Sequence, residues 1–185
     1  MKKYIFLFSS LVIMSLTSCS SEDPEIVNEE ELITTLRVTL TPQGGGNVVT
    51  LQLQDLDGDG PNAPITTVSG PLQANKTYTG VTQVLNETES PAENITLEVE
   101  EEGDEHQFFY TFSNSIATVT YSDQDKNGRP VGINFNLTTT SAGIGNLTVV
   151  LRHEPNKTAA GVMAGNITNA GGETDVEATF NLTVN

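Results

Sequence analysis

The sequence predicts an all-β fold, an immunoglobulin-like β-sandwich of about seven to nine antiparallel strands, with a jelly roll or small barrel as the alternative. From Leu32 onward, apolar residues alternate with threonine and asparagine, as in strands that bury one face. Clusters of glycine, asparagine and aspartate separate these runs, and no long stretch has the period of an amphipathic helix. The 185-residue length suits one such domain, which we expect over residues 32–185.

Six alternating runs each predict a strand. Their apolar positions are Leu36/Val38/Leu40, Val49/Leu51/Leu53, Val119/Tyr121, Val131/Ile133/Phe135/Leu137, Leu147/Val149/Leu151 and Val176/Ala178/Phe180/Leu182/Val184. Turn signals lie between them at residues 44–47, 57–60, 127–128, 143–145 and 170–172. We therefore expect short strands joined by tight connections.

Residues 90–99 favour neither helix nor strand decisively. Ser90 and Pro91 resemble an N-cap and a first helical residue, but Ile95, Leu97 and Val99 also alternate as in a strand. We expect one or two helical turns in this segment, signalled by the N-cap pattern at Ser90 and ended by Gly103. A strand over residues 106–112 then follows.

Composition excludes several classes of function. The chain has 8 Lys+Arg against 24 Asp+Glu, and its net charge of −16 disfavours binding to nucleic acid or anionic lipid. A single Cys excludes a disulfide framework and multi-cysteine metal modules. The motifs G-x-S-x-G, G-x-G-x-x-G, the P-loop and H-E-x-x-H are absent, and a chain without Trp offers little for a sugar cleft. We expect no enzyme and no organic cofactor, with a carboxylate-pair hydrolase as the remaining catalytic alternative.

The first residues predict export. Residues 1–18 combine two lysines with a short apolar run, the pattern of a signal peptide. The segment Leu16-Thr17-Ser18-Cys19 resembles the bacterial lipobox, which implies that Cys19 carries the lipid anchor. Residues 19–31 are acidic and polar, so we expect a solvated tether, and their acidic cluster resembles the surface-export signal of Bacteroidota lipoproteins.

Two aspartate loops have the spacing of a calcium loop. The first contains Asp55, Asp57 and Asp59, and the second contains Asp123, Asp125 and Asn127; each ends in glycine. Neither has the bidentate Glu at position twelve, so any calcium affinity would fall in the weak, extracellular range. The alternative is that both loops are solvated hairpin turns.

The only two histidines are the candidate ligands for zinc or another divalent transition metal. If residues 106–153 formed an up-and-down meander of four strands, His106 and His153 would lie at the same end of the sandwich, beside Glu105 and Glu154. Imidazole and carboxylate groups together suit such a metal. The alternative is two unrelated surface histidines.

Four segments resemble a group of small flavobacterial envelope lipoproteins. They are Glu30-Glu31-Leu32-Ile33-Thr34-Thr35, the stretch from Asp55 to Pro64, Asp104-Glu105-His106-Gln107-Phe108-Phe109-Tyr110 and Leu151-Arg152-His153-Glu154-Pro155-Asn156-Lys157. The resemblance implies a bacterial envelope lipoprotein with an all-β domain, similar to accessory proteins of TonB-dependent outer-membrane transporters, and it transfers no catalytic residues. Exposure at the outer face of the outer membrane is implied by the acidic cluster after Cys19, with display toward the periplasm as the alternative.

Two functions follow from these observations. The first is a non-enzymatic binding or accessory module for a surface ligand, stabilised by calcium. The alternative is a metal-binding lipoprotein that serves a TonB-dependent transporter.

Overall fold

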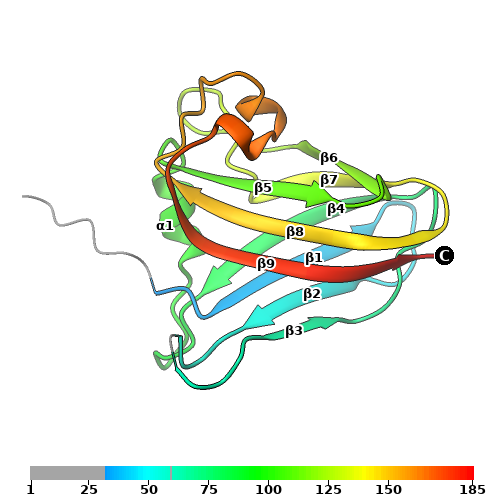
Figure 1. Ribbon diagram of the computed structural model, residues 1–185, viewed down its shortest axis with the longest axis horizontal. Helices are drawn as coiled ribbons and strands as arrows, with labels where there is room; N and C mark the ends of the chain where they lie inside the picture. Colours follow the sequence, from blue (N-terminus) through cyan, green and yellow to red (C-terminus); the bar gives the residue numbers. More distant parts are fainter. Residues whose placement is uncertain (1–31, 59) are drawn as a thin grey trace, which may run out of the picture.

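The computed structural model describes residues 32–58 and 60–185, which fold as a β-sandwich (Figure 1). Within these residues, nine strands form two antiparallel sheets, and the all-β sandwich predicted from the sequence is confirmed. The predicted signal peptide, the tether with Cys19, and Asp59 lie outside the described residues. No helix in the described part of the chain has the length and apolar character needed to cross a membrane.

The larger sheet has six strands in the order β3-β2-β1-β4-β7-β6, and the smaller has three in the order β5-β8-β9. The strands of the larger sheet are β1 (Thr35–Pro42), β2 (Val49–Gln54), β3 (Ile65–Val68), β4 (Thr77–Leu85), β6 (Ala117–Tyr121) and β7 (Asn134–Thr139). Those of the smaller sheet are β5 (His106–Phe112), β8 (Gly143–His153) and β9 (Glu173–Val184). The helical elements are α1 (Thr96–Glu101) and two short 3₁₀ turns, η1 (Val162–Ala164) and η2 (Ile167–Asn169).

The main core lies between the two sheets and contains the apolar positions of all six predicted runs. Two strands, β3 and β4, lie where the sequence predicts none. The buried face of β4 includes Gly80 and Thr82 in place of large apolar residues. A Cβ added at Gly80 would overlap the Phe135 ring, and the Thr82 hydroxyl lies 2.6 Å from the Tyr110 hydroxyl. This face packs tightly without showing an apolar pattern in the sequence.

The predicted meander of residues 106–153 is wrong. Strand β5 pairs with β8 in the smaller sheet, whereas β6 pairs with β7 in the larger one. The burial pattern gives the reason: residues 106–110 are buried without interruption, so both faces of β5 must be covered. Strand β6 instead alternates buried or half-buried residues with exposed threonines, as on a sheet with one wet face.

The predicted helix exists but starts later than expected. The backbones of Asn86 and Glu93 exchange two hydrogen bonds of 3.1 and 3.0 Å, which holds residues 86–93 in a turn. Helix α1 therefore begins at Thr96, not beside Ser90, and it ends before Gly103. The expected strand over residues 106–112 is β5.

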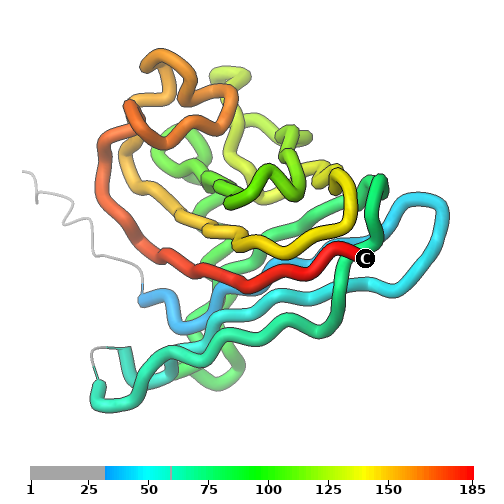
Figure 2. Tube along the Cα trace, turned by 45° about the vertical axis from the view of Figure 1, so that its right-hand side comes forward, coloured from blue at the N-terminus to red at the C-terminus, as the bar shows by residue number. Residues whose placement is uncertain are grey.

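The long connection between β8 and β9, residues 154–172, lies at one end of the smaller sheet (Figure 2) and packs on part of its outer face. Phe109 and Val150 are paired neighbours on that face, and they pack against Val162 and Ala170 of the connection. The connection thus builds a second, smaller core and brings Lys157 near the start of β5.

Candidate metal centre

The two histidines lie directly opposite each other on neighbouring strands. His106 begins β5 and His153 ends β8, and the antiparallel register pairs these two positions. Their rings stack with centroids 4.7 Å apart and planes inclined by 25°. The two histidines therefore lie together, as the hypothesis from the sequence requires. The pairing of β5 with β8 brings them together, and not a four-stranded meander.

A third side chain, Asp175 of β9, completes the group. Its two carboxylate oxygens lie 3.9 Å from His106 Nε2 and 3.9 Å from His153 Nδ1, respectively. The register between β8 and β9 shifts here, because Leu151 pairs with Val176 whereas Arg152 pairs with Thr174. Asp175 is the extra residue of this bulge, and bulges commonly redirect a side chain next to a functional site.

Asp175 is missing from the sequence-based set for a physical reason. In a regular strand, the position before Val176 points away from the core, so the alternation assigns Asp175 to the solvent face. Only the register shift shows otherwise, and the sequence carries no clear signal for it beyond the glycines that precede β9.

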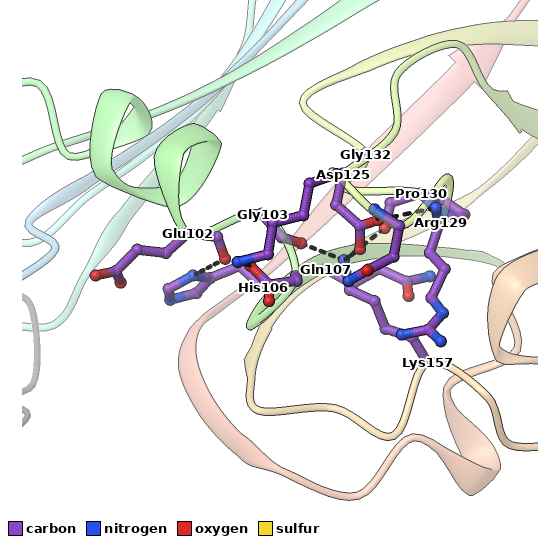
Figure 3. Close-up of polar contacts among 12 residues, drawn as sticks. Glu102, Gly103, His106, Gln107, Asp125, Arg129, Pro130, Gly132 and Lys157 are labelled. Carbon is purple, nitrogen blue, oxygen red and sulfur yellow. Dashed lines mark hydrogen bonds and ion pairs between the residues drawn. The ribbon is translucent and has the colours of Figure 1, made fainter.

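His106 is buried, and one of its ring nitrogens is hydrogen bonded to the backbone. Its side chain is fully buried, and Nδ1 lies 3.2 Å from the carbonyl oxygen of Glu102 (Figure 3). Since a carbonyl only accepts, this contact favours the tautomer with the proton on Nδ1, in which Nε2 carries the lone pair. Burial lowers the pKa of His106, and the nearby imidazole of His153 lowers it further, against the raising effect of the Glu102 carbonyl.

The predicted partners Glu105 and Glu154 form a separate, exposed group. Each offers a carboxylate oxygen, and together with one nitrogen of His153 these atoms lie within 4.8 Å of one another. The Glu154 N–H donates to the Glu105 carbonyl at 2.6 Å, which holds the two residues side by side. The four sequence-predicted residues therefore divide into a buried pair and an exposed pair that meet at His153.

The second aspartate loop binds a cation that belongs to the chain. The Lys157 ammonium donates to Asp125 Oδ2 at 3.1 Å, to the Pro130 carbonyl at 2.9 Å and to the Gly103 carbonyl (Figure 3). The side chains of Lys157 and Asp125 are each 1% exposed. Lys157 thus ties the β8–β9 connection to the β6–β7 loop and to the turn after α1.

The other carboxylate oxygens of this loop also have partners within the chain. Asp125 Oδ1 accepts the N–H groups of Asn127 and Arg129 at 2.8 and 3.0 Å. Asp123 accepts the N–H groups of Gly132 and Asn134 at 2.8 and 2.7 Å. Calcium binding by Asp123, Asp125 and Asn127 stays a prediction, and the geometry gives the carboxylates a structural role that needs no metal.

The pKa values of this ion pair shift downward together. Burial lowers the pKa of Lys157, while the hydrogen bond and charge of Asp125 oppose that shift. For Asp125, burial raises the pKa, but hydrogen bonds from Arg129, Lys157 and Asn127 outweigh it and leave the pKa lowered. The lowered pKa of Asp125 keeps its carboxylate ionised near neutral pH, and this charge opposes deprotonation of Lys157.

The first aspartate loop remains open to a cation. Asp57 Oδ2 accepts both the backbone N–H and the side-chain amide of Asn62, at 3.2 and 2.7 Å. Asp55 and Asp57 line a surface cleft of about 270 Å³. Since Asp59 lies outside the described residues, calcium binding here stays a prediction.

We compared the chain with protein-family models, curated proteins and solved structures, and none of the three comparisons finds a match.

Proposed function

We propose that this protein binds a divalent transition metal such as zinc through His106, His153 and Asp175. The observation that carries the proposal is the placement of two opposed imidazoles with one carboxylate 3.9 Å from both. Two nitrogen donors and one oxygen donor suit zinc, copper or nickel better than calcium, which prefers oxygen. Within the described residues the group offers three protein ligands, and a tetrahedral ion takes a fourth ligand as well.

The ligand atoms are close enough to converge on one ion. They lie within 4.8 Å of one another, whereas the ligands of tetrahedral zinc, with bonds of about 2.0–2.1 Å, are separated by about 3.3 Å. Binding of one ion would require the stacked rings, which are inclined by 25°, to rotate until both nitrogen lone pairs point to the same position. The hydrogen bond from His106 Nδ1 to the Glu102 carbonyl supports the proposal, since metal-bound histidines usually donate their second nitrogen in this way.

The cellular setting is part of the proposal and rests on the sequence. A lipid on Cys19 would anchor the domain to the outer membrane, with residues 20–31 as a tether. Delivery of the metal to a TonB-dependent transporter is the corresponding partnership. The second candidate function, a non-enzymatic accessory module, would need the loop cleft of about 490 Å³ near Tyr121 and Met163 as its ligand site.

Zinc titration of the purified full-length protein tests the proposal. We expect one ion per chain by calorimetry, and at a free zinc concentration of about one hundred times Kd we expect stabilisation of about 2.7 kcal/mol. Asp175→Asn and His153→Gln should each weaken binding by at least about tenfold. Glu177→Gln is the matched control, because Glu177 is an exposed acid on the same strand that pairs with Val150, away from both ligand groups. The proposal fails if zinc, copper, nickel and cobalt all leave the wild-type protein unchanged.

A further inference from the structure

We propose that Glu105 and Glu154 form an outer metal position that shares His153 with the buried centre, and that the ion enters and leaves through it. This inference rests on the proposed metal-binding function. It gives the ion a route to the buried centre, and it gives a function to the exposed Glu105 and Glu154.

The geometry of the two ligand groups supports a shared histidine. The buried group is His106, His153 and Asp175, and the exposed group is Glu105, His153 and Glu154; within each group the ligand atoms lie within 4.8 Å of one another. His153 is the one residue common to both. Because the Glu105 and Glu154 backbones are hydrogen bonded at 2.6 Å, the two outer carboxylates stay beside this histidine.

Burial indicates the direction from which the ion arrives. The His106 side chain is 0% exposed, whereas those of His153 and Asp175 are 13% and 11% exposed. An ion therefore reaches His106 from the side of His153. Glu105 and Glu154 are both exposed, so the outer position meets solvent first.

A shared ligand lowers the barrier between the two positions. An ion at the outer position already lies beside the His153 ring, so it needs to move only from one group of ligands to the adjacent group to reach Asp175 and His106. One imidazole in its ordinary neutral form binds one ion, because its other nitrogen carries a proton. The two positions are therefore filled in turn, and the protein holds one ion per chain.

The charge around the outer position favours cations. Residues 100–102 are three successive glutamates, followed closely by Asp104 and Glu105. Lys126 pairs with Asp104 at 2.9 Å, and Lys157 is committed to Asp125. Acidic side chains therefore predominate in the segment that precedes His106, with Arg152 next to His153 as the neighbouring cation, and acidic surfaces raise the local concentration of cations and their association rate.

Stopped-flow kinetics of zinc uptake and of zinc release to a chromophoric chelator test the inference on the full-length protein. The variant is Glu105→Gln with Glu154→Gln, and the matched control is Glu100→Gln with Glu101→Gln, which removes the same charge from the same acidic surface. We expect the variant to slow both association and release by about tenfold relative to the control, with Kd unchanged. Equal effects on both rates are the signature of a lost intermediate position, whereas a lost ligand of the final site would raise Kd.

Each other outcome has a distinct meaning. If the wild-type protein binds no zinc, both this inference and the proposed function fail. If zinc binds but the variant and the control have the same rates, only the outer position is refuted. Simultaneous binding of two zinc ions by the wild-type protein also overturns the shared-histidine mechanism and leaves the buried centre intact.

Discussion

Two neighbouring groups at one end of the sandwich differ in whether they contain a positive charge of their own. In the lysine cluster, defined as Lys157 with Asp125, Gly103 and Pro130, the chain supplies its own cation and surrounds it with three oxygens. In the histidine cluster, defined as His106, His153 and Asp175, two imidazoles and a carboxylate converge, and none of the three is a permanent cation. The first arrangement stabilises the fold, and the second is suited to an ion from solution.

The comparison shows why aspartate spacing alone does not identify a calcium site. Asp123, Asp125 and Asn127 have the required spacing, but a lysine that is distant in sequence binds Asp125 Oδ2, and backbone N–H groups donate to the other carboxylate oxygens. The histidines have no recognisable sequence motif. Strand pairing and one bulge bring their ligand atoms together.

The largest effect that we predict comes from removing the built-in cation. Lys157→Met leaves the buried Asp125 carboxylate and two carbonyl oxygens without their ammonium partner, so we expect the free energy of unfolding to fall by about 3 kcal/mol. Urea unfolding measures this loss. The control is Lys126→Met, which removes an exposed lysine paired with Asp104 and should change stability little.

A double-mutant cycle separates the pair from other contacts of Lys157. Asp125→Asn combined with Lys157→Met should cost less than the sum of the two single changes, because no buried charge then lacks a partner. Strictly additive losses would show that the lysine cluster does not act as an ion pair.

The next effect is a loss of stability in acid that depends on the histidine cluster. Burial lowers the folded-state pKa of His106 below the ordinary value of 6.5. As the pH falls through 6.5, the unfolded chain binds this proton first, so the folded state loses stability until the pH passes the lowered pKa. One proton limits the slope to about 1.4 kcal/mol per pH unit.

Unfolding curves recorded in EDTA across this pH window measure the slope. His106→Gln should flatten it, and the carboxylate contributions common to both proteins cancel in the difference. Parallel pH profiles for the wild type and His106→Gln would contradict a buried neutral His106. Zinc should restore wild-type stability in the upper part of the window, where protons compete less strongly for the imidazole.

The strands that could be predicted from sequence are those whose buried face is apolar. Alternation identifies β1, β2 and β9 directly, because leucine, valine and phenylalanine face the core. It fails for β4, where Gly80 and Thr82 occupy buried positions: a large ring packs on the glycine, and a hydrogen bond satisfies the threonine. Such complementarity depends on partners distant in the chain and leaves no local pattern.

The candidate site, like the strands, contains some residues that the sequence predicts and others that it does not. The alternation of side chains along a strand places His106 and His153 on the core-facing side of their strands. This part of the prediction is correct although the predicted strand order is wrong. Asp175 and Lys157 escape prediction because their roles depend on a register shift and on a long loop that folds back over the sheet. Neither event follows from residue type or spacing.

The smallest effect that we predict is a calcium response created by emptying the lysine cluster. Lys157→Ala leaves Asp125 Oδ2 and the carbonyls of Gly103 and Pro130 around the position of the ammonium. Calcium needs six or more oxygens, so water must supply the others and the affinity should be millimolar. Calcium at a few times Kd would then stabilise this variant by just under about 1 kcal/mol.

Thermal unfolding with calcium and with EDTA measures this response. Asp125→Asn in the Lys157→Ala background is the matched control, and it should lose the response with the carboxylate. Any calcium response of the wild-type protein must come from elsewhere, and Asp55→Asn tests the first aspartate loop as its source. If the wild type and Lys157→Ala respond equally, the ammonium does not occupy a cation position, and the contrast between the two clusters loses its basis.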